Sequence, residues 1–462
     1  MIPLSVGEIA AVAGARTDRV PDPAALVTGP VVIDSRQVRP GALFAALPGE
    51  RADGHDFAAA AAAAGAVVTL GTRPTGTAAL LVDDVPAALG LLARAVVDRL
   101  PGLVIAGITG SAGKTTTKDL AAQLIGTLGP TVAPENSFNN EIGHPLTVLR
   151  ADADTRYLVA ELSARGPGHI TALCRIAPPR LGVVLCVGNA HAGEFGGVAR
   201  IAVAKAELPR ALPADGVAVL NADDPLVSAM AADTAARVVT FGRSAGADVI
   251  AADVSLDRLS RPRFTLRMPD GAAGVSLRLH GEHNVTNALA AAALAGQLGM
   301  DVAAIADGLS YAQARSRWRM EVTERPDGVI IVNDAYNASP EAVTAALDAV
   351  RVMAAGRRAY AVLGRMAELG ERSREFHEQA GMAAARTGIA GLIAVGDEAA
   401  PMLTGAKAVA GFSGELIAVP DGAAALAALG ERLRPGDIVL VKASRAAGLQ
   451  AVALQLASEA AR

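Results

Sequence analysis

Short apolar runs rich in β-branched residues alternate with longer alanine-rich segments along almost the whole chain. The short runs have the length of buried strands and the alanine-rich segments have the length of helices, for example over residues 58–64 and 87–100. This alternation is typical of βαβ units around parallel sheets, so the pattern predicts an α/β fold. The clearest strand candidates are Leu103–Thr109, Tyr157–Glu161, Gly182–Val187, Val217–Asn221, Val329–Asn333, Tyr360–Leu363, Leu392–Val395 and Ile438–Val441.

Two breaks in this pattern suggest domain boundaries. Arg99–Gly102 ends a helical segment before a strong strand, and the polar segment Gln313–Arg319, with three arginines, precedes a new βα series. We therefore predict three domains, over residues 1–100, 101–315 and 316–462. A chain of 462 residues at about 150 residues per domain agrees with that number.

Composition narrows the class of protein. Hydrophobic residues make up 52% of the chain and charged residues 19%, which excludes a disordered chain. The formal net charge of −4 argues against a nucleic-acid partner. Only Cys174 and Cys186 are present, so a disulfide framework and a four-cysteine zinc site are excluded. The sequence has no run of 18 strongly apolar residues and no basic signal region, so we expect a cytoplasmic protein without membrane insertion.

The strongest local signal is a glycine-rich turn between an apolar strand and a helical segment. It consists of Gly110, Ser111, Ala112, Gly113, Lys114, Thr115 and Thr116. Glycines let backbone N–H groups approach phosphate oxygens, the lysine reaches the terminal phosphates, and the Thr115 hydroxyl is a Mg²⁺ ligand in such loops. The usual eight-residue pattern has glycine where this chain has Ile108, and an incidental glycine turn is the alternative. The signal predicts ATP binding.

The loop also refines the predicted architecture. We predict that the middle domain contains a P-loop ATPase-like parallel sheet. It is flanked by a smaller N-terminal α/β domain and a Rossmann-like C-terminal domain. The C-terminal block has no G-x-G-x-x-G after a strand, so we expect no dinucleotide site there.

Three further residues are candidates for metal chemistry. Glu161 ends a strand whose carboxyl end should face the ligand crevice, although a helix cap or surface carboxylate is the alternative. His191 stands in a glycine-rich loop after the next strand, where an ordinary loop histidine is equally compatible. Lys205 lies on an otherwise apolar helical segment; it either reaches solvent with its amine or is paired or chemically altered.

Taken together, the motifs resemble those of the Mur ligases, and the resemblance covers nearly the whole chain in order. The motifs are Ile33–Arg36, Asp53–Phe57, Thr109–Thr117, Asn136–Thr147, Gly188–Gly196, His283–Asn287, Asp334–Pro340, Leu363–Gly370 and Val441–Arg445. The chain departs from the family's usual pattern at Ser163, His169, Ser339 and Arg365. These departures concern loop detail and substrate preference rather than the ATP chemistry.

The resemblance implies specific roles. It places Lys114 and Thr115 at the ATP phosphates, Glu161 and His191 on magnesium, and Lys205 as a carbamylated lysine that holds a second Mg²⁺. It further assigns Asn287 to adenine, Asp334 to ribose and Arg319 to the terminal phosphate, with Lys114, His191, Lys205 and Arg319 as the catalytic set. Ser35 and Arg36 would bind the uridine-diphosphate end of the substrate, and Asn139 and Asn140 would lie in a substrate-facing loop.

The activity implied is the ATP-dependent joining of D-alanyl-D-alanine to UDP-N-acetylmuramoyl-tripeptide in peptidoglycan synthesis, by a monomer whose domains close over the substrates. Alternatives are a ligase adding the third amino acid, a folylpolyglutamate synthase, or a regulatory module that binds ATP or a UDP-sugar without turnover. Independently of the resemblance, Asn284 and Asn287 share one helical face, Asn284 as a possible N-cap, and Ser339 should cap a helix starting at Pro340. His377 is predicted to be a surface residue of a helix.

Overall fold

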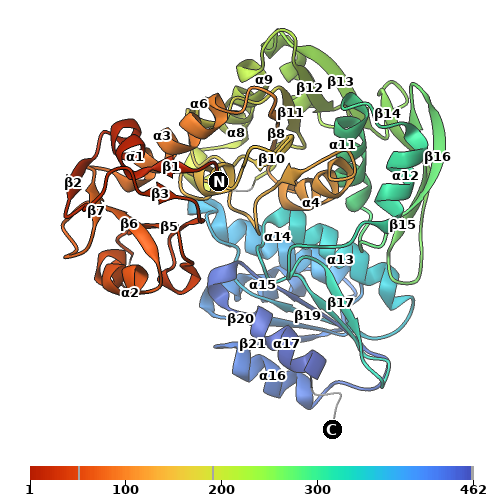
Figure 1. The fold of residues 1–462 in the computed structure, drawn as a ribbon. Coiled ribbons are helices and arrows are strands. Elements are labelled where there is room, and N and C mark those ends of the chain that lie inside the picture. The colour runs from red at the N-terminus through yellow and green to blue at the C-terminus, as the bar shows by residue number, and fades with distance from the viewer. Residues whose placement is uncertain (50–51, 190–191, 459–462) are drawn as a thin grey trace.

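The computed structural model describes residues 1–49, 52–189 and 192–458, and its strands form three larger sheets and one two-stranded sheet (Figure 1). The three larger sheets follow one another along the chain, and each contains parallel strands connected by helices, which confirms the predicted α/β class. In the view of Figure 1 the N-terminal region lies to the left, the middle region above and the C-terminal region below.

The N-terminal region contains a five-stranded sheet of order β2-β7-β6-β5-β4, parallel except between β2 and β7, and the short antiparallel pair β1–β3. Asp84 caps the last helix by accepting a hydrogen bond from the Ala87 N–H, so this helix starts two residues before the predicted position. The elements are β1 (Leu4–Ser5), α1 (Val6–Ala13), β2 (Arg16–Asp18), β3 (Leu26–Val27), β4 (Val31–Val32), β5 (Ala42–Ala45), α2 (Ala58–Ala63), β6 (Ala66–Gly71), β7 (Ala79–Leu81) and α3 (Val85–Asp98).

The middle region is built on a nine-stranded sheet of order β16-β15-β14-β13-β12-β11-β8-β10-β9. It is parallel from β9 to β14 and ends in an antiparallel β14–β15–β16 meander. Its strands are β8 (Val104–Thr109), β9 (Thr131–Val132), β10 (Tyr157–Glu161), β11 (Leu181–Val184), β12 (Val217–Asn221), β13 (Arg237–Gly242), β14 (Val249–Leu256), β15 (Pro262–Met268) and β16 (Gly271–Ser276). Its helices are α4 (Lys114–Ile125), α5 (Gly143–Val148), α6 (His169–Ile176), α7 (Ala192–Phe195), α8 (Val198–Lys205), α9 (Glu207–Ala211), α10 (Pro225–Ser228), α11 (Asn284–Gln297) and α12 (Val302–Tyr311).

The C-terminal region has a six-stranded sheet of order β17-β18-β22-β19-β20-β21, in which only β17 runs antiparallel to its neighbour. As predicted, Ser339 caps the helix that starts at Pro340, and its hydroxyl accepts the Ala342 N–H. The elements are β17 (Glu321–Glu324), β18 (Ile330–Asn333), α13 (Pro340–Ala354), β19 (Ala359–Leu363), α14 (Ser373–Arg386), β20 (Gly391–Val395), α15 (Pro401–Lys407), β21 (Glu415–Val419), α16 (Gly422–Gly430), β22 (Ile438–Lys442) and α17 (Gln450–Ser458).

Small side chains set the packing around the glycine-rich turn. The centre of α11 is almost all alanine and fully buried, so this helix packs closely against α4 and the sheet. Leu120 and Leu124 of α4 belong to the same core. The N-terminal region is joined to the middle one by a shared apolar cluster in which Leu89 and Leu92 of α3 lie with Leu146 of α5. The turn therefore lies on a closely packed apolar core.

The structure corrects two predictions. The strand predicted over Gly182–Val187 is observed as Leu181–Val184, because the following backbone turns to the glycine-rich loop, where the Cys186 carbonyl accepts the Ser111 N–H. His377 is fully buried on α14 rather than exposed: its Nε2 accepts the Met366 N–H at 3.0 Å and its Nδ1 bonds the Ser373 carbonyl. No helix in the described ranges is long and apolar enough to cross a membrane.

Candidate active site

The glycine-rich turn lies between β8 and α4, as its sequence predicts. Gly113 has a φ of 82°, and a Cβ atom there would stand 2.3 Å from the Asn287 Oδ1, so both the backbone conformation and the close approach of α11 require glycine. Lys114 is the first residue of α4, and its Nζ donates to the Gly110 carbonyl at 2.8 Å. The loop amides, the start of α4 and the Lys114 ammonium thus meet at one end of the sheet.

Lys114 lies half-buried among charged neighbours. Burial lowers the pKa of Lys114, the nearby Glu161 carboxylate opposes this shift, and the Arg319 guanidinium adds to it. Two cations from different regions of the chain, Lys114 and Arg319, therefore lie in one pocket, where Glu161 is the carboxylate that opposes the shift at Lys114. A polyanion such as a triphosphate would relieve the repulsion between them.

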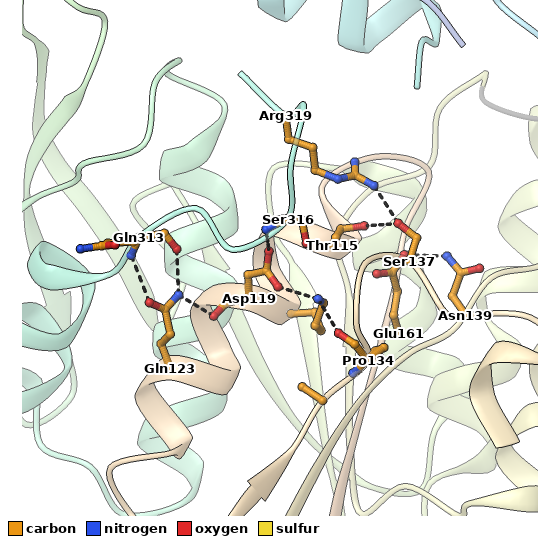
Figure 2. Close-up of polar contacts among 12 residues, drawn as sticks. Thr115, Asp119, Gln123, Pro134, Ser137, Asn139, Glu161, Gln313, Ser316 and Arg319 are labelled. Carbon is orange, nitrogen blue, oxygen red and sulfur yellow. Dashed lines mark hydrogen bonds and ion pairs between the residues drawn. The ribbon is translucent and has the colours of Figure 1, made fainter. Parts of the chain in front are cut away.

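Glu161 ends β10 beside the turn, and its side chain is buried. Its Oε1 accepts a hydrogen bond from the Asn139 Nδ2 at 2.7 Å. Its Oε2 is buried with no hydrogen-bond partner among the described residues. Next to it, the Thr115 hydroxyl is hydrogen-bonded to the Ser137 hydroxyl at 3.1 Å (Figure 2). The neighbouring Thr115 hydroxyl and free carboxylate oxygen are hard oxygen donors of the kind that Mg²⁺ prefers.

A cavity of about 660 Å³ lies between the middle and C-terminal regions and contains most of the predicted site. The two walls of this cavity come from different regions. The first wall belongs to the middle region and consists of the glycine-rich turn and the ends of β10 and β11. The second wall belongs to the C-terminal region and consists of lining residues between Ser316 and Ala345, together with Lys442. Among the predicted residues, those lining it are Ser111, Ala112, Gly113, Lys114, Thr115, Thr116, Asn139, Asn140, Glu161, Asn287, Arg319 and Asp334.

On the second wall, Arg319 reaches across to the middle region. Its Nη2 donates to the Ser137 Oγ at 2.8 Å, and its guanidinium carbon stands 4.2 Å from the centre of the Tyr336 ring. Its Nε is buried without a partner among the described residues. Stacking on an aromatic ring orients the planar guanidinium, so Arg319 is presented to the cavity with an unused donor.

Asp334 follows β18 and also lines the cavity, but both of its oxygens are engaged. Oδ1 accepts the Met320 N–H at 3.0 Å, and Oδ2 receives a charge-assisted bond from the buried Lys442 ammonium. Lys442 also donates to the Asn337 carbonyl at 3.0 Å. A ligand at Asp334 would have to share these oxygens.

Asn284 and Asn287 do lie on one face of α11, where Asn287 Nδ2 donates to Asn284 Oδ1 at 2.8 Å. Asn287 Oδ1 accepts from the Thr117 hydroxyl at 3.3 Å. The possible N-cap role of Asn284 is wrong, because the helix starts at Asn284 itself and its side chain donates back to the His280 carbonyl. His280 and His283 also line this end of the cavity, and burial lowers the pKa of both.

Lys205, the last residue of α8, is buried behind the turn rather than in the cavity lining. Burial, reinforced by the charge of Lys114, lowers its pKa to about 7. A large fraction of this amine is therefore neutral at neutral pH. The interpretation that it simply reaches solvent is wrong, since only 5% of the residue is exposed.

The remaining predicted residues are placed less centrally. Arg36 is in the short 3-10 helix Ser35–Gln37, with its exposed guanidinium paired to Asp34 at 2.7 Å, and neither Ser35 nor Arg36 lines the cavity. Asn140 lines the cavity, but its Oδ1 accepts the Gly143 N–H at the start of α5. His191 lies outside the described residues.

Sequence reasoning missed several residues of the site. Ser137 lies inside the motif Asn136–Thr147 and links Thr115 to Arg319, and Lys442 lies inside Val441–Arg445. Tyr336 could have been expected as a stacking partner from its place two residues after Asp334. Asp119 also lines the cavity. The sequence offered only one indication of this, namely that Asp119 lies on the helical segment that follows the turn.

Three family models match the chain in order: "Mur ligase family, catalytic domain" over residues 30–98, "Mur ligase middle domain" over 108–295 and "Mur ligase, glutamate ligase domain" over 318–445. The UDP-N-acetylmuramoyl-tripeptide–D-alanyl-D-alanine ligase of Mycobacterium tuberculosis is 50% identical, over 99% of this chain and 98% of the relative.

Among solved structures, Mur ligases are also similar to this chain. MurF from Acinetobacter baumannii has a TM-score of 0.86 at 30% identity, with 98% of this chain and 99% of that one covered. MurF ligase from Thermotoga maritima in complex with ADP has a TM-score of 0.79 at 31% identity, with 94% and 98% covered. The chain belongs to the Mur ligase family.

Proposed function

We propose that this chain is an ATP-dependent ligase that joins D-alanyl-D-alanine to UDP-N-acetylmuramoyl-tripeptide and so completes the pentapeptide precursor of peptidoglycan. The observation that carries the proposal is the 50% identity to a ligase of this name along nearly the full length of both chains. The cavity between the middle and C-terminal regions supports the proposal, because cationic and oxygen-bearing side chains suited to ATP and Mg²⁺ line it. A ligase for the third amino acid, a folylpolyglutamate synthase and a non-catalytic module are not favoured.

The chemistry begins with a carboxylate that is a poor electrophile. An oxygen of the tripeptide's terminal carboxylate attacks the γ-phosphorus of ATP, and ADP leaves. The free amine of D-alanyl-D-alanine then attacks the acyl phosphate carbon, inorganic phosphate leaves with the transferred oxygen, and the amine gives up a proton as the amide forms. Charge moves onto phosphate oxygens in both steps, so positioning and electrostatic stabilisation are the main tasks of the protein.

The residues of the cavity fit these tasks from two sides. Lys114 and the loop amides would hold the β- and γ-phosphates from the middle region. Arg319, whose Nε has no partner among the described residues, would neutralise the transferring phosphoryl group from the opposite wall. Asn287 and Asp334 are the proposed contacts for adenine and ribose, and both line the cavity.

Magnesium fits the residues present. The free Oε2 of Glu161 and the Thr115 hydroxyl would hold the ion, which supplies charge neutralisation at the phosphates. No group of three or more histidine, cysteine or acidic side chains in the described part of the chain could hold a metal alone. Mg²⁺ at nucleotide sites is commonly held by one or two protein ligands, phosphate oxygens and water. The assignment of His191 to the same ion remains part of the proposal.

Lys205 is the proposed site of a carbamate and of a second Mg²⁺. The ammonium first loses a proton, and the neutral amine then attacks the carbon of CO₂, forming an N–C bond and releasing a second proton. A positive charge is thereby replaced by a negative one. Support comes from its burial beside Lys114, where a cation is unfavourable and an anion would be attracted. With this change the formal net charge of −4 would become about −6.

The division of labour is also part of the proposal. Residues 1–100, with Ser35 and Arg36, would bind the uridine-diphosphate end, residues 101–315 would bind ATP, and residues 316–462 would complete the site on closure. Asn139 and Asn140 would face the peptide. We further propose that the protein is cytoplasmic, because ATP and nucleotide-linked sugars are cytoplasmic substrates. A monomeric state is also part of the proposal.

The test is ADP release by the full chain with ATP, Mg²⁺ and UDP-N-acetylmuramoyl-tripeptide, measured with and without D-alanyl-D-alanine. We expect ADP formation to depend on the dipeptide and a pentapeptide product of matching mass. Release that depends instead on a free amino acid and UDP-N-acetylmuramoyl-dipeptide would support the third-residue ligase, and glutamate-dependent release with a folate would support the folylpolyglutamate synthase. Binding without turnover would support the regulatory module.

A further inference from the structure

The segment that brings Arg319 to the cavity is tied to the helix that carries the phosphate-binding lysine. Gln123 of α4 and Gln313 exchange two hydrogen bonds, from Gln123 Nε2 to the Gln313 carbonyl at 3.0 Å and from the Gln313 N–H to Gln123 Oε1 at 3.1 Å (Figure 2). Gln123 Nε2 also donates to the Asp119 carbonyl at 2.9 Å. The start of the segment thus follows α4 rather than the C-terminal sheet.

Asp119 makes the second tie, three residues further along the segment. Its Oδ2 accepts the backbone N–H of Ser316 at 3.0 Å, and Ser316 is itself buried. Its Oδ1 accepts from the Lys118 ammonium at 2.5 Å. Lys118 is 2% exposed and also donates to the Pro134 carbonyl at 2.9 Å. A buried ion pair of this kind is costly to disrupt, so the direction of the Asp119 carboxylate is fixed.

Beyond Ser316 the backbone is held in an unusual conformation on both sides of Arg319. Trp318 and Met320 have positive φ angles of 59° and 50°, which side chains other than glycine rarely adopt. The Trp318 carbonyl accepts the Tyr336 N–H at 3.1 Å, and the Met320 N–H donates to Asp334. Such a conformation persists only where the surroundings fix it. Here Tyr336 and Asp334 of the C-terminal region bond the two residues that flank Arg319, and α4 holds the segment up to Ser316.

Lys114, Thr115 and Asp119 all belong to α4, so their relative positions are set by one helix. We propose that Asp119 is a positioning residue for Arg319. Through the Ser316 N–H it holds the segment Gln313–Arg319 in register with α4, so that the guanidinium reaches the phosphate held by Lys114. The inference rests on the proposed ligase function, because the readout that matters is phosphoryl transfer.

A matched pair of double variants tests this role. Lys118→Met with Asp119→Asn removes the buried charges but keeps an oxygen that can accept the Ser316 N–H. Lys118→Met with Asp119→Leu has nearly the same shape and no acceptor. We expect kcat of the Leu variant to be about tenfold below that of the Asn variant, because small displacements of a catalytic group are costly. The affinities of the Leu and Asn variants for ADP should agree within about twofold, because Lys114 and the glycine-rich loop are unchanged in both.

The Arg319→Ala background separates positioning from general damage. If Asp119 acts through Arg319, the difference between the Leu and Asn variants should disappear in that background. A persistent difference, equal kcat values of the pair in the wild-type background, or a parallel loss of ADP affinity would each overturn the inference.

Amide hydrogen exchange provides a readout that does not need turnover. Exchange over residues 313–320 should be faster in the Leu variant than in the Asn variant, with equal exchange in the C-terminal sheet. Equal protection of this segment in the two variants would also overturn the inference. If the wild-type chain shows no dipeptide-dependent ADP release, the proposed function fails, whereas the exchange result still decides whether Asp119 holds the segment.

Discussion

The two walls of the cavity are built in different ways. The middle-region wall has its main groups on one continuous stretch, Ser111–Thr116, which follows a buried strand and continues into α4. The C-terminal wall collects Arg319, Asp334 and Lys442 from three separate stretches and fixes them through one another. A local motif can therefore be recognised from the sequence, whereas the second wall depends on contacts between residues more than 100 positions apart.

This difference also separates two tasks. Under the proposed function, the first wall would bind nucleotide phosphates without the second, since its amides and Lys114 belong to one loop and one helix. In the same proposal, the second wall would act on the bound phosphate only when the segment before Arg319 is correctly placed. We therefore expect substitutions in the first wall to weaken both nucleotide binding and turnover, and substitutions in the second to affect mainly turnover.

The largest effect is expected for Lys114→Met. It removes the cation at the phosphates, so turnover should fall about a thousandfold or more and ADP affinity should fall with it. ADP release and calorimetric ADP binding measure the two quantities. The exposed Lys407→Met on α15 is the control for loss of a lysine charge. Unchanged ADP affinity in the Lys114 variant would remove the distinction between the walls.

The second largest effect is expected for Arg319→Ala. Turnover should fall about a hundredfold, and ADP affinity should stay almost unchanged. The measurement is the same pair of assays. Arg317→Ala is the matched control, because Arg317 is an exposed arginine of the same segment that does not line the cavity. Near-wild-type turnover of the Arg319 variant would contradict its assignment to the transferring phosphate.

A smaller effect is expected for Glu161→Gln, which keeps an oxygen for Asn139 but removes the charge. The Mg²⁺ concentration for half-maximal turnover should rise about tenfold, with activity partly recovered at high Mg²⁺. A magnesium titration of ADP release checks this, with the exposed Glu135→Gln as control. If the two titrations coincide, Glu161 does not hold the ion.

The smallest effect on turnover is expected at His144, which lies behind the first wall on α5. Burial lowers the pKa of His144 from 6.5 to about 4, and its Nε2 has no partner among the described residues. Because the unfolded chain binds the proton more tightly, its contribution to stability is complete above pH 6.5 and is lost as the pH falls toward 4. The loss is about 3 kcal/mol at most.

Urea unfolding between pH 4.5 and 7.5 tests this assignment. His144→Leu should reduce the pH dependence of the unfolding free energy in that range, and the part due to His280, His283 and His377, whose pKa burial also lowers, should remain. Turnover at pH 7.5 should stay near that of the wild type. An unchanged slope would show that His144 does not contribute to this pH dependence.

Much of the fold follows from the sequence because buried parallel strands are continuous apolar runs. Strands such as Tyr157–Glu161 and Val217–Asn221 were predicted with their observed bounds. The β14–β16 meander was missed, because its strands alternate buried and exposed positions and lack such runs. His377 was misplaced because its burial depends on the backbone N–H of Met366, eleven residues away in a loop.

For the site, local motifs were sufficient for the loop, Glu161 and Asn287, all of which line the cavity. The tie between Asp119 and Ser316 could not be predicted, since it joins residues 197 positions apart through a backbone group that has no sequence signature. The roles of Ser35 and Arg36 remain predictions that rest on the family resemblance.

The most direct test of the account is the fate of the carboxylate oxygen during turnover. UDP-N-acetylmuramoyl-tripeptide labelled with ¹⁸O in its terminal carboxylate is incubated with ATP, Mg²⁺, D-alanyl-D-alanine and the wild-type chain, and the released phosphate is analysed by mass spectrometry. If both walls act on one phosphoryl group to form an acyl phosphate, each phosphate released with pentapeptide carries one oxygen from the tripeptide. Unlabelled phosphate, or phosphate formed equally well without the dipeptide, would contradict the account.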